Sequence, residues 1–231
     1  MAISWVGDGG IAVNTSDNVT PALPAGWAPN DIFLCAITSH DHINCTLPAG
    51  WTAIDAGTND SGENGDLRTT LYYRRAVGGD VAPLVTHGGG GGISAIVVAY
   101  RGVILSDPPT GVIGATSTQL STTMTFHAAG IITTADNDWV IEFGGIYTSG
   151  NASGYTGTPT PTERVDEPSV PMYPQLIIAD FLQAVAGGTG ARACTISGVA
   201  KPNNGLLVSF KEEPPPPPYG LSSVGVAIMM G

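Results

Sequence analysis

Charged residues are scarce in this sequence of 231 residues: they make up 12% of the chain, roughly half of the usual quarter. Basic residues are rarest, with eight Lys and Arg against 19 Asp and Glu, and only Lys201 and Lys211 are lysines. The formal net charge is −11, so most of the surface would repel a polyanion. The composition therefore argues against nucleic acid as a ligand.

Long apolar runs are absent as well: no stretch reaches the roughly 18 apolar residues of a membrane-spanning helix. The opening residues MAISWVGDGG lack the basic start and apolar stretch of a secretion signal. We therefore expect neither membrane insertion nor classical secretion.

Cysteine is rare: the chain has three, Cys35, Cys45 and Cys194. This is an odd number, and no two of them have C-x-x-C spacing. This pattern favours free, buried thiols over a disulfide framework or a zinc site. Cys35 lies within the apolar run IFLCAI and is predicted to be in the core. Assembly in a reducing cytoplasm is the simpler interpretation.

Glycine and proline are abundant, with 32 and 18 residues, and both disfavour helices. Between turn-rich segments lie short apolar or β-branched runs of strand length, which predict an antiparallel β-sandwich with less than about 10% helix. QLIIADFLQAVA fits either a strand or a short helix. The predicted strands are 3–6, 31–38, 67–75, 93–100, 122–126, 139–147, 175–181, 191–197 and 205–210.

An internal repeat connects two halves of the chain, at about 31–103 and 138–211. Asp31 opens DIFLCAI and Asp138 opens DWVIEFG, and an AVxGG-like segment follows each at Ala76 and Ala184. Two similar halves predict a jelly-roll-like sandwich, in which Phe33 corresponds to Val140. Chance similarity and a tandem pair of separate sandwiches are the alternatives; we favour one domain over 1–211.

Residues 212–231 depart from this pattern and form a C-terminal extension. Pro214–Pro218 predict a stiff polyproline II rod about 15 Å long, and an uncharged apolar segment follows. We expect it to dock on a neighbouring subunit by strand addition, although a disordered tail is the alternative. The predicted docking residues are Pro214, Pro218, Tyr219, Leu221, Val224, Val226, Ile228 and Met230.

Acidic and histidine clusters give weak metal signals. His40, Asp41 and His42 lack a third ligand nearby in sequence, so an exposed loop is expected. The loop with Asp60, Glu63 and Asp66 lacks the order of a calcium loop, which leaves only unspecific calcium binding. No metal or other cofactor is predicted.

Catalytic motifs are missing too. HGGGGG at 87–92 and AGGTG at 186–190 have no following GK[ST] and fit turns better than phosphate loops. No G-x-S-x-G elbow occurs, and His87 and His127 are expected at strand ends. The sequence predicts no enzyme.

Aromatic residues offer one further binding chemistry, stacking on sugar rings. In a strand, Tyr72 and Tyr73 face opposite sides, as do Arg74 and Arg75, so at most one pair shares a surface. Trp27 and Trp51, each in LPAGW, are expected to plug loops onto the sandwich. A ligand patch of Tyr147, Tyr155 and Tyr173 has no supporting motif.

The chain resembles small virion proteins of tailed bacteriophages over roughly residues 3–211. The resemblance is one of pattern, without a single diagnostic motif, and the proline rod lies outside it. The segments that carry it are LPAGW, PAGWT (48–52), LYYRRAVGGD (71–80), AIVVAYRGV (95–103), ADFLQAVAGGTGARACTISG (179–198) and GLLVSFK (205–211).

This resemblance implies a β-sandwich or jelly-roll virion component without catalysis, such as a capsid decoration or minor head protein. Major capsid or tail and fibre subunits would be its partners, with a homo-oligomer expected and the virion as its location. The alternative is a carbohydrate-binding or adhesion module of a phage fibre, with a surface glycan as ligand. Aromatics grouped on an open face would favour the glycan alternative, and buried aromatics the virion one.

Overall fold

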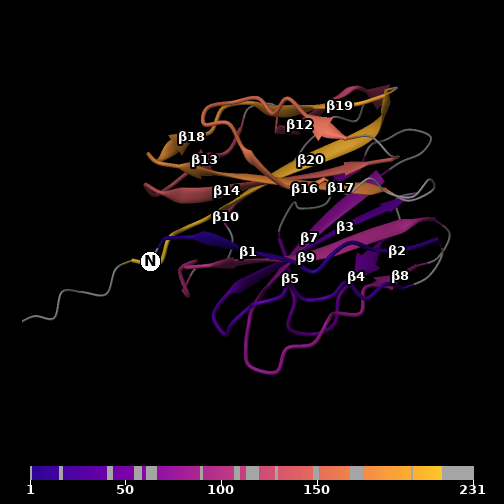
Figure 1. Ribbon diagram of the computed structural model, residues 1–231, viewed down its shortest axis with the longest axis horizontal. Helices are drawn as coiled ribbons and strands as arrows, with labels where there is room; N and C mark the ends of the chain where they lie inside the picture. Colours follow the sequence, from indigo (N-terminus) through magenta and orange to yellow (C-terminus); the bar gives the residue numbers. More distant parts are fainter. Residues whose placement is uncertain are drawn as a thin grey trace, which may run out of the picture.

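The computed structural model describes residues 2–15, 18–40, 44–54, 59–60, 67–88, 91–106, 110–112, 120–127, 130–147, 151–166, 174–198 and 200–214. Within them every regular element is a β-strand and none is a helix, which confirms the all-β prediction (Figure 1). The ambiguous segment QLIIADFLQAVA begins with a strand. No helix among these residues has the length and apolarity needed to cross a membrane.

The first half of the chain builds one large antiparallel sheet, the N-terminal sheet, drawn in indigo to magenta in Figure 1. Along its main path the described strands are β1 (Ser4–Asp8), β9 (Ile93–Arg101), β3 (Ile32–His40), β7 (Leu67–Arg75) and β5 (Thr52–Ala53). Two short strands extend it: β2 (Ala12–Asn14) pairs with β9, and β6 (Asn59–Asp60) pairs with β7.

The second half builds the C-terminal sheet, in rose to yellow. Its described strands follow the order β10 (Thr110–Val112), β20 (Lys201–Phe210), β14 (Asp138–Ile146), β17 (Gln175–Gln183) and β16 (Thr162–Asp166). A further short strand, β11 (Leu120–Ser121), pairs with β20.

Three small sheets complete the described strands. One contains β12 (Thr123–His127), β19 (Arg192–Ile196) and β15 (Ala152–Ser153). The others are the pairs β13 (Ile132–Thr133) with β18 (Gly187–Gly188), and β4 (Cys45–Thr46) with β8 (Thr86–His87). His87 and His127 therefore end strands, as predicted.

The two large sheets pack face to face, as the two layers in Figure 1 show, and form a β-sandwich. Their shared core contains Leu34 and Tyr100 from one sheet and Phe143 and Phe210 from the other. Burial of these side chains on both inner faces holds the layers together through the hydrophobic effect.

The outer faces of both sheets are covered too. Phe33 and Cys35 point away from the sandwich core into a second cluster, under loops and the β4–β8 pair. On the other side, Val140 and Phe181 pack beneath the β12–β19–β15 sheet. Because the central strands are buried on both faces, they appear in the sequence as continuous apolar runs rather than alternating ones.

Buried polar contacts also join the sheets. The Tyr100 hydroxyl donates to Asp180 Oδ2 at 2.9 Å, and Arg164 Nε bonds both oxygens of the same carboxylate. Further along, Thr69 Oγ1 donates to Asn204 Oδ1 at 2.6 Å. These bonds satisfy polar groups that would be costly to bury alone.

The central strands follow the same order in both sheets, β9–β3–β7 and β20–β14–β17. Phe33 lies opposite Arg74 and Ala99, and Val140 occupies the same central-strand position opposite Phe181 and Ser209.

The turns before β3 and β14 are also alike. Each contains an asparagine with positive φ, Asn30 at 76° and Asn137 at 63°. Asparagine is one of the few residues that tolerates this left-handed conformation. The next residue in each, Asp31 or Asp138, accepts a hydrogen bond from the backbone N–H three residues earlier.

Ala76 and Ala184, which the repeat matches to each other, differ by one residue in their strand pairing. Both carbonyls accept a bond from the N–H of the asparagine in the neighbouring turn. However, Ala76 N–H bonds Asp31 O, whereas Asp138 lies opposite Gln183. The second half has one more residue between these points, which accounts for the displacement.

Candidate functional site

The base of the C-terminal extension is fixed to one end of the sandwich, here called the exit end. Residues 211–213 continue β20 and pair antiparallel with residues 102–105, which lead out of β9. Glu213 N–H donates to Gly102 O at 2.8 Å, and the Glu213 carboxylate accepts from Leu105 N–H at 2.9 Å. The position from which the extension leaves is therefore set by the fold.

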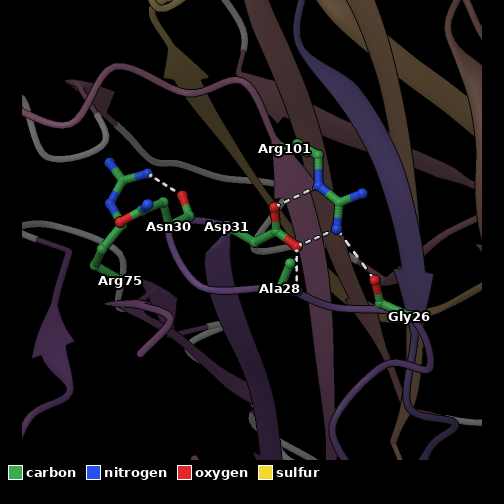
Figure 2. A network of polar contacts seen from close by, with 6 residues as sticks. All are labelled: Gly26, Ala28, Asn30, Asp31, Arg75 and Arg101. Carbon is green, nitrogen blue, oxygen red and sulfur yellow. Dashed lines mark hydrogen bonds and ion pairs between the residues drawn. The ribbon is translucent and has the colours of Figure 1, made fainter. Parts of the chain in front are cut away.

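Arg75 supports this pairing from the end of β7. Its guanidinium donates to three backbone carbonyls, those of Asn30 at 2.9 Å, Val103 at 3.2 Å and Ile104 at 2.6 Å; Figure 2 shows the first of these. Burial lowers the pKa of Arg75, and the nearby Glu213 carboxylate acts in the opposite direction. The side chain thus ties the turn before β3 to the segment that holds the extension.

Asp31 and Arg101 form the second bridge at this end (Figure 2). Arg101 Nε and Nη2 each donate to one carboxylate oxygen at 2.8 Å, and Arg101 Nη2 also reaches Gly26 O at 3.1 Å. The Asp31 side chain is 2% exposed and that of Arg101 is 42% exposed. The bond to Asp31 raises the pKa of Arg101. This two-bond geometry fixes both side chains.

A hollow of about 300 Å³ lies on one side of the base of the extension. Its lining includes Pro29, Val103 and Leu105 together with the paired Arg101 and Glu213. Leu105 is 56% exposed, which is high for a large apolar side chain. We refer to this cavity as the Leu105 hollow.

A second hollow, of about 230 Å³, borders the same segment through Glu212. Its apolar lining is Ala2, Ile3, Trp139 and Leu182, and Leu182 is 40% exposed. We refer to it as the Leu182 hollow. In Figure 1 the N-terminal residues lie close to the yellow end of β20, where this hollow forms. Two apolar hollows thus flank Glu212 and Glu213 in the described part of the chain.

Of the predicted docking residues, only Pro214 is described, and it is exposed directly after this anchored segment. The others lie outside the described residues: Pro218, Tyr219, Leu221, Val224, Val226, Ile228 and Met230. The hollows beside the base were not foreseen, because their linings come from segments far apart in the sequence.

The histidine cluster is partly corrected. His40 does not lie in an exposed loop; it ends β3, half-buried, and stacks on Tyr147 with ring centroids 4.4 Å apart. Asp41 and His42 lie outside the described residues. Among the residues that the structure describes, no three His, Cys, Asp or Glu side chains are grouped to hold a metal ion.

The acidic loop falls largely outside the structure's description. Asp60 lies in β6, while Glu63 and Asp66 belong to the residues that are not described, as does Tyr173.

The aromatic residues of the first half pack against the sheet, two of them from loops. Trp27 and Trp51 contact Phe33 with ring centroids 5.3 and 6.3 Å apart, as predicted. Tyr72 faces the outer cluster and Tyr73 the sandwich core, so these neighbours alternate as expected. In these positions the rings serve packing.

Glu142 and Arg192 are two buried ionisable residues that no sequence motif marks. Both side chains are 0% exposed, and neither Glu142 oxygen has a hydrogen-bond partner among the described residues. Burial raises the pKa of Glu142 to about 8, while the Arg192 charge acts against that rise. Arg192 lies 3.8 Å above the Phe181 ring and donates to three backbone carbonyls. Only folding brings the two together.

Comparisons with protein-family models, with curated proteins and with solved structures find no match for this chain. Function is therefore argued from the site itself rather than from relatives.

Proposed function

We propose that this chain is a non-enzymatic structural protein of a bacteriophage virion, a capsid decoration or other minor head protein. Its C-terminal extension binds neighbouring virion subunits, such as the major capsid protein or tail and fibre subunits. The observation that carries the proposal is the pairing of residues 211–213 with 102–105. An apolar extension that starts from a rigid base is suited to strand addition on a partner.

The charged side chains around this base support a structural role. Asp31 is engaged by Arg101, Arg75 by three carbonyls and Glu213 by Leu105 N–H. Each of these groups stabilises the local backbone. Together these contacts hold the base of the extension in a fixed position at the exit end.

The carbohydrate-binding alternative is less well supported. Every described Trp, Tyr and Phe side chain is buried or half-buried. Sugar platforms need aromatic rings presented together on an open face. Trp27 and Trp51 pack on Phe33 instead.

We also infer that the two halves are equivalent units. The shared strand order and the matching turns at Asn30 and Asn137 support this interpretation. Each large sheet draws its described strands from one half of the chain, whereas strands of a jelly roll alternate between its two sheets. The jelly-roll part of the expectation stays a prediction.

Removal of the extension tests the proposal. A chain that stops after Glu213 should fold, because its core and the 211–213 pairing are intact, but should no longer bind virions that lack the protein. Binding is measured by co-sedimentation with such virions, and the full-length protein is the positive control. Undiminished binding of the shortened chain would overturn the proposal, and retention on a glycan array would favour the alternative.

A further inference from the structure

We infer that the Leu105 hollow and the Leu182 hollow receive the C-terminal extension of a second copy of this chain. Two copies would then meet at their exit ends and exchange extensions. This inference rests on the proposed function in one respect: it takes the extension to be a docking element. It adds the identity of a partner and the surface that the extension occupies.

The position of the hollows is the first argument. Glu212 lines one hollow and Glu213 lines the other, so the surface that could receive an extension surrounds the point from which an extension leaves. When two copies face each other across a two-fold axis with their exit ends about one rod length apart, each extension points toward the hollows of its partner. Such an interface is self-complementary and closes as a dimer.

The chemistry of the two surfaces is the second argument. Residues 214–231 contain no charged side chain, and the hollows present the exposed apolar side chains Leu105 and Leu182. Asp31 is already bound by Arg101, and Glu213 accepts from Leu105 N–H and lies near the charge of Arg75, so covering them leaves neither carboxylate without a partner. Docking therefore avoids the cost of burying an isolated ion.

The five prolines favour a second copy over the chain's own extension. Pro214–Pro218 follow Glu213 directly, and in the polyproline II form they would carry the apolar segment about 15 Å away. The chain's own hollows lie immediately beside Glu212 and Glu213. A stiff rod that began at these residues would lead away from them and toward a facing molecule.

Disulfide trapping in the full-length protein tests whether the Leu105 hollow binds the extension of a second copy or the extension of the same chain. Leu105→Cys is combined in turn with Val224→Cys, Val226→Cys and Ile228→Cys, and Leu84→Cys replaces Leu105→Cys as a control. Leu84 is similarly exposed, at 50%, and lines neither hollow. The native cysteines are buried and should not interfere.

A covalent dimer from at least one Leu105→Cys combination, with none from the Leu84→Cys controls, is the expected result on a non-reducing gel. A disulfide confined to one chain would overturn the inference in favour of the chain's own extension. Absence of any disulfide in all three combinations would overturn it as well.

Sedimentation of the double variant Leu105→Glu with Leu182→Glu gives an independent measurement. We expect self-association to weaken by about tenfold or more, since both apolar contacts are lost, while Leu84→Glu behaves as the unchanged protein. Near-ultraviolet circular dichroism checks that each variant is folded. A full-length protein that is monomeric yet binds virions through its extension would overturn this inference and leave the proposed function standing.

Discussion

Glu142 is the residue whose surroundings differ most from those expected of its type. It lies in the middle of β14, fully buried on the side that the β12–β19–β15 sheet covers, with Arg192 as its charged neighbour. Arg192 has carbonyl partners of its own at Thr158, Pro159 and Thr189. The carboxyl group is therefore more stable in the folded protein when it is protonated.

This burial predicts a pH dependence of stability. The pKa of Glu142 is about 8 in the folded protein and about 4.5 ordinarily. Between these values the folded state binds a proton that the unfolded state has released, so its contribution to the free energy of unfolding falls as pH rises. Glu142→Gln should lose this slope and should gain stability relative to the native protein above about pH 8.

Urea unfolding at about pH 5 and about pH 9 measures the effect. Glu163→Gln, which changes an exposed carboxylate on β16, is the control and should keep the native slope. Identical pH slopes for the native protein and Glu142→Gln would contradict the assignment.

The cysteines predict a second property at the residue scale. All three are free and buried, and burial raises the pKa of Cys45 to about 11 and of Cys194 to about 12. Few thiolates form at neutral pH, and reagents have little access to them. A thiol reagent should label the folded protein very slowly but should find three thiols after unfolding without reductant. A count of one would reveal a disulfide instead.

At the scale of elements, a pair of glycines decides how closely the β12–β19–β15 sheet packs on the C-terminal sheet. Gly144 of β14 lies opposite Gly205 of β20, and β12 crosses above them. A Cβ at Gly205 would lie 2.7 Å from Phe126 Cα, and one at Gly144 would meet Met124 Sδ. The missing side chains let β12 approach the backbone directly.

Gly205→Ala should therefore destabilise the protein by about 1–3 kcal/mol through overpacking. Gly78→Ala is the matched control, because a Cβ there meets no atom within 4 Å. Chemical denaturation gives the free energy of unfolding for both variants. Equal stabilities would show that β12 moves aside without cost.

Strand boundaries show which element properties could be predicted. Strand β7 (Leu67–Arg75) matches its predicted range because its β-branched and aromatic run is bounded by turn residues. Strand β20 starts at Lys201 instead of Gly205. Asn203 and Asn204 read as loop residues, yet both are fully buried, and Asn204 accepts from Thr69 of the facing sheet. Polar residues satisfied by a distant partner leave no local pattern.

At the scale of the whole molecule, the two sheets depend on one core. The inner cluster takes side chains from both halves, and the Tyr100–Asp180 bond crosses between them. Burial and the neighbouring Asp180 raise the pKa of the Tyr100 hydroxyl, so it stays protonated and donates that bond. Neither half can bury its inner face alone.

Residues 1–213 should therefore unfold in one cooperative transition. Trp139 lies in the second half, so in a Trp139→Phe variant the remaining Trp5, Trp27 and Trp51 report on the first half by fluorescence. Far-ultraviolet circular dichroism of the same variant reports on both sheets. The two probes should give the same urea midpoint, since loss of one sheet exposes the core of the other. Two separated midpoints would indicate independent halves.

The sequence by itself determined the all-β class, the antiparallel strands, the free thiols and the packing of Trp27 and Trp51. These properties follow from local patterns: strand-length apolar runs, turn residues, and the odd cysteine count. Such patterns act through backbone preference and burial of neighbouring residues, which are readable within a short window.

Only the tertiary structure decided the buried Glu142–Arg192 site, the position of His40 against Tyr147, and the two hollows at the exit end. In each, the residues that meet are far apart in the chain, so their energies depend on which strands pack together. The Leu182 hollow joins Ile3 to Trp139 and Glu212 because two sheets end at the same place. No local backbone preference specifies that the two sheets end together. Burial of the shared core aligns the sheets and so brings these residues into contact.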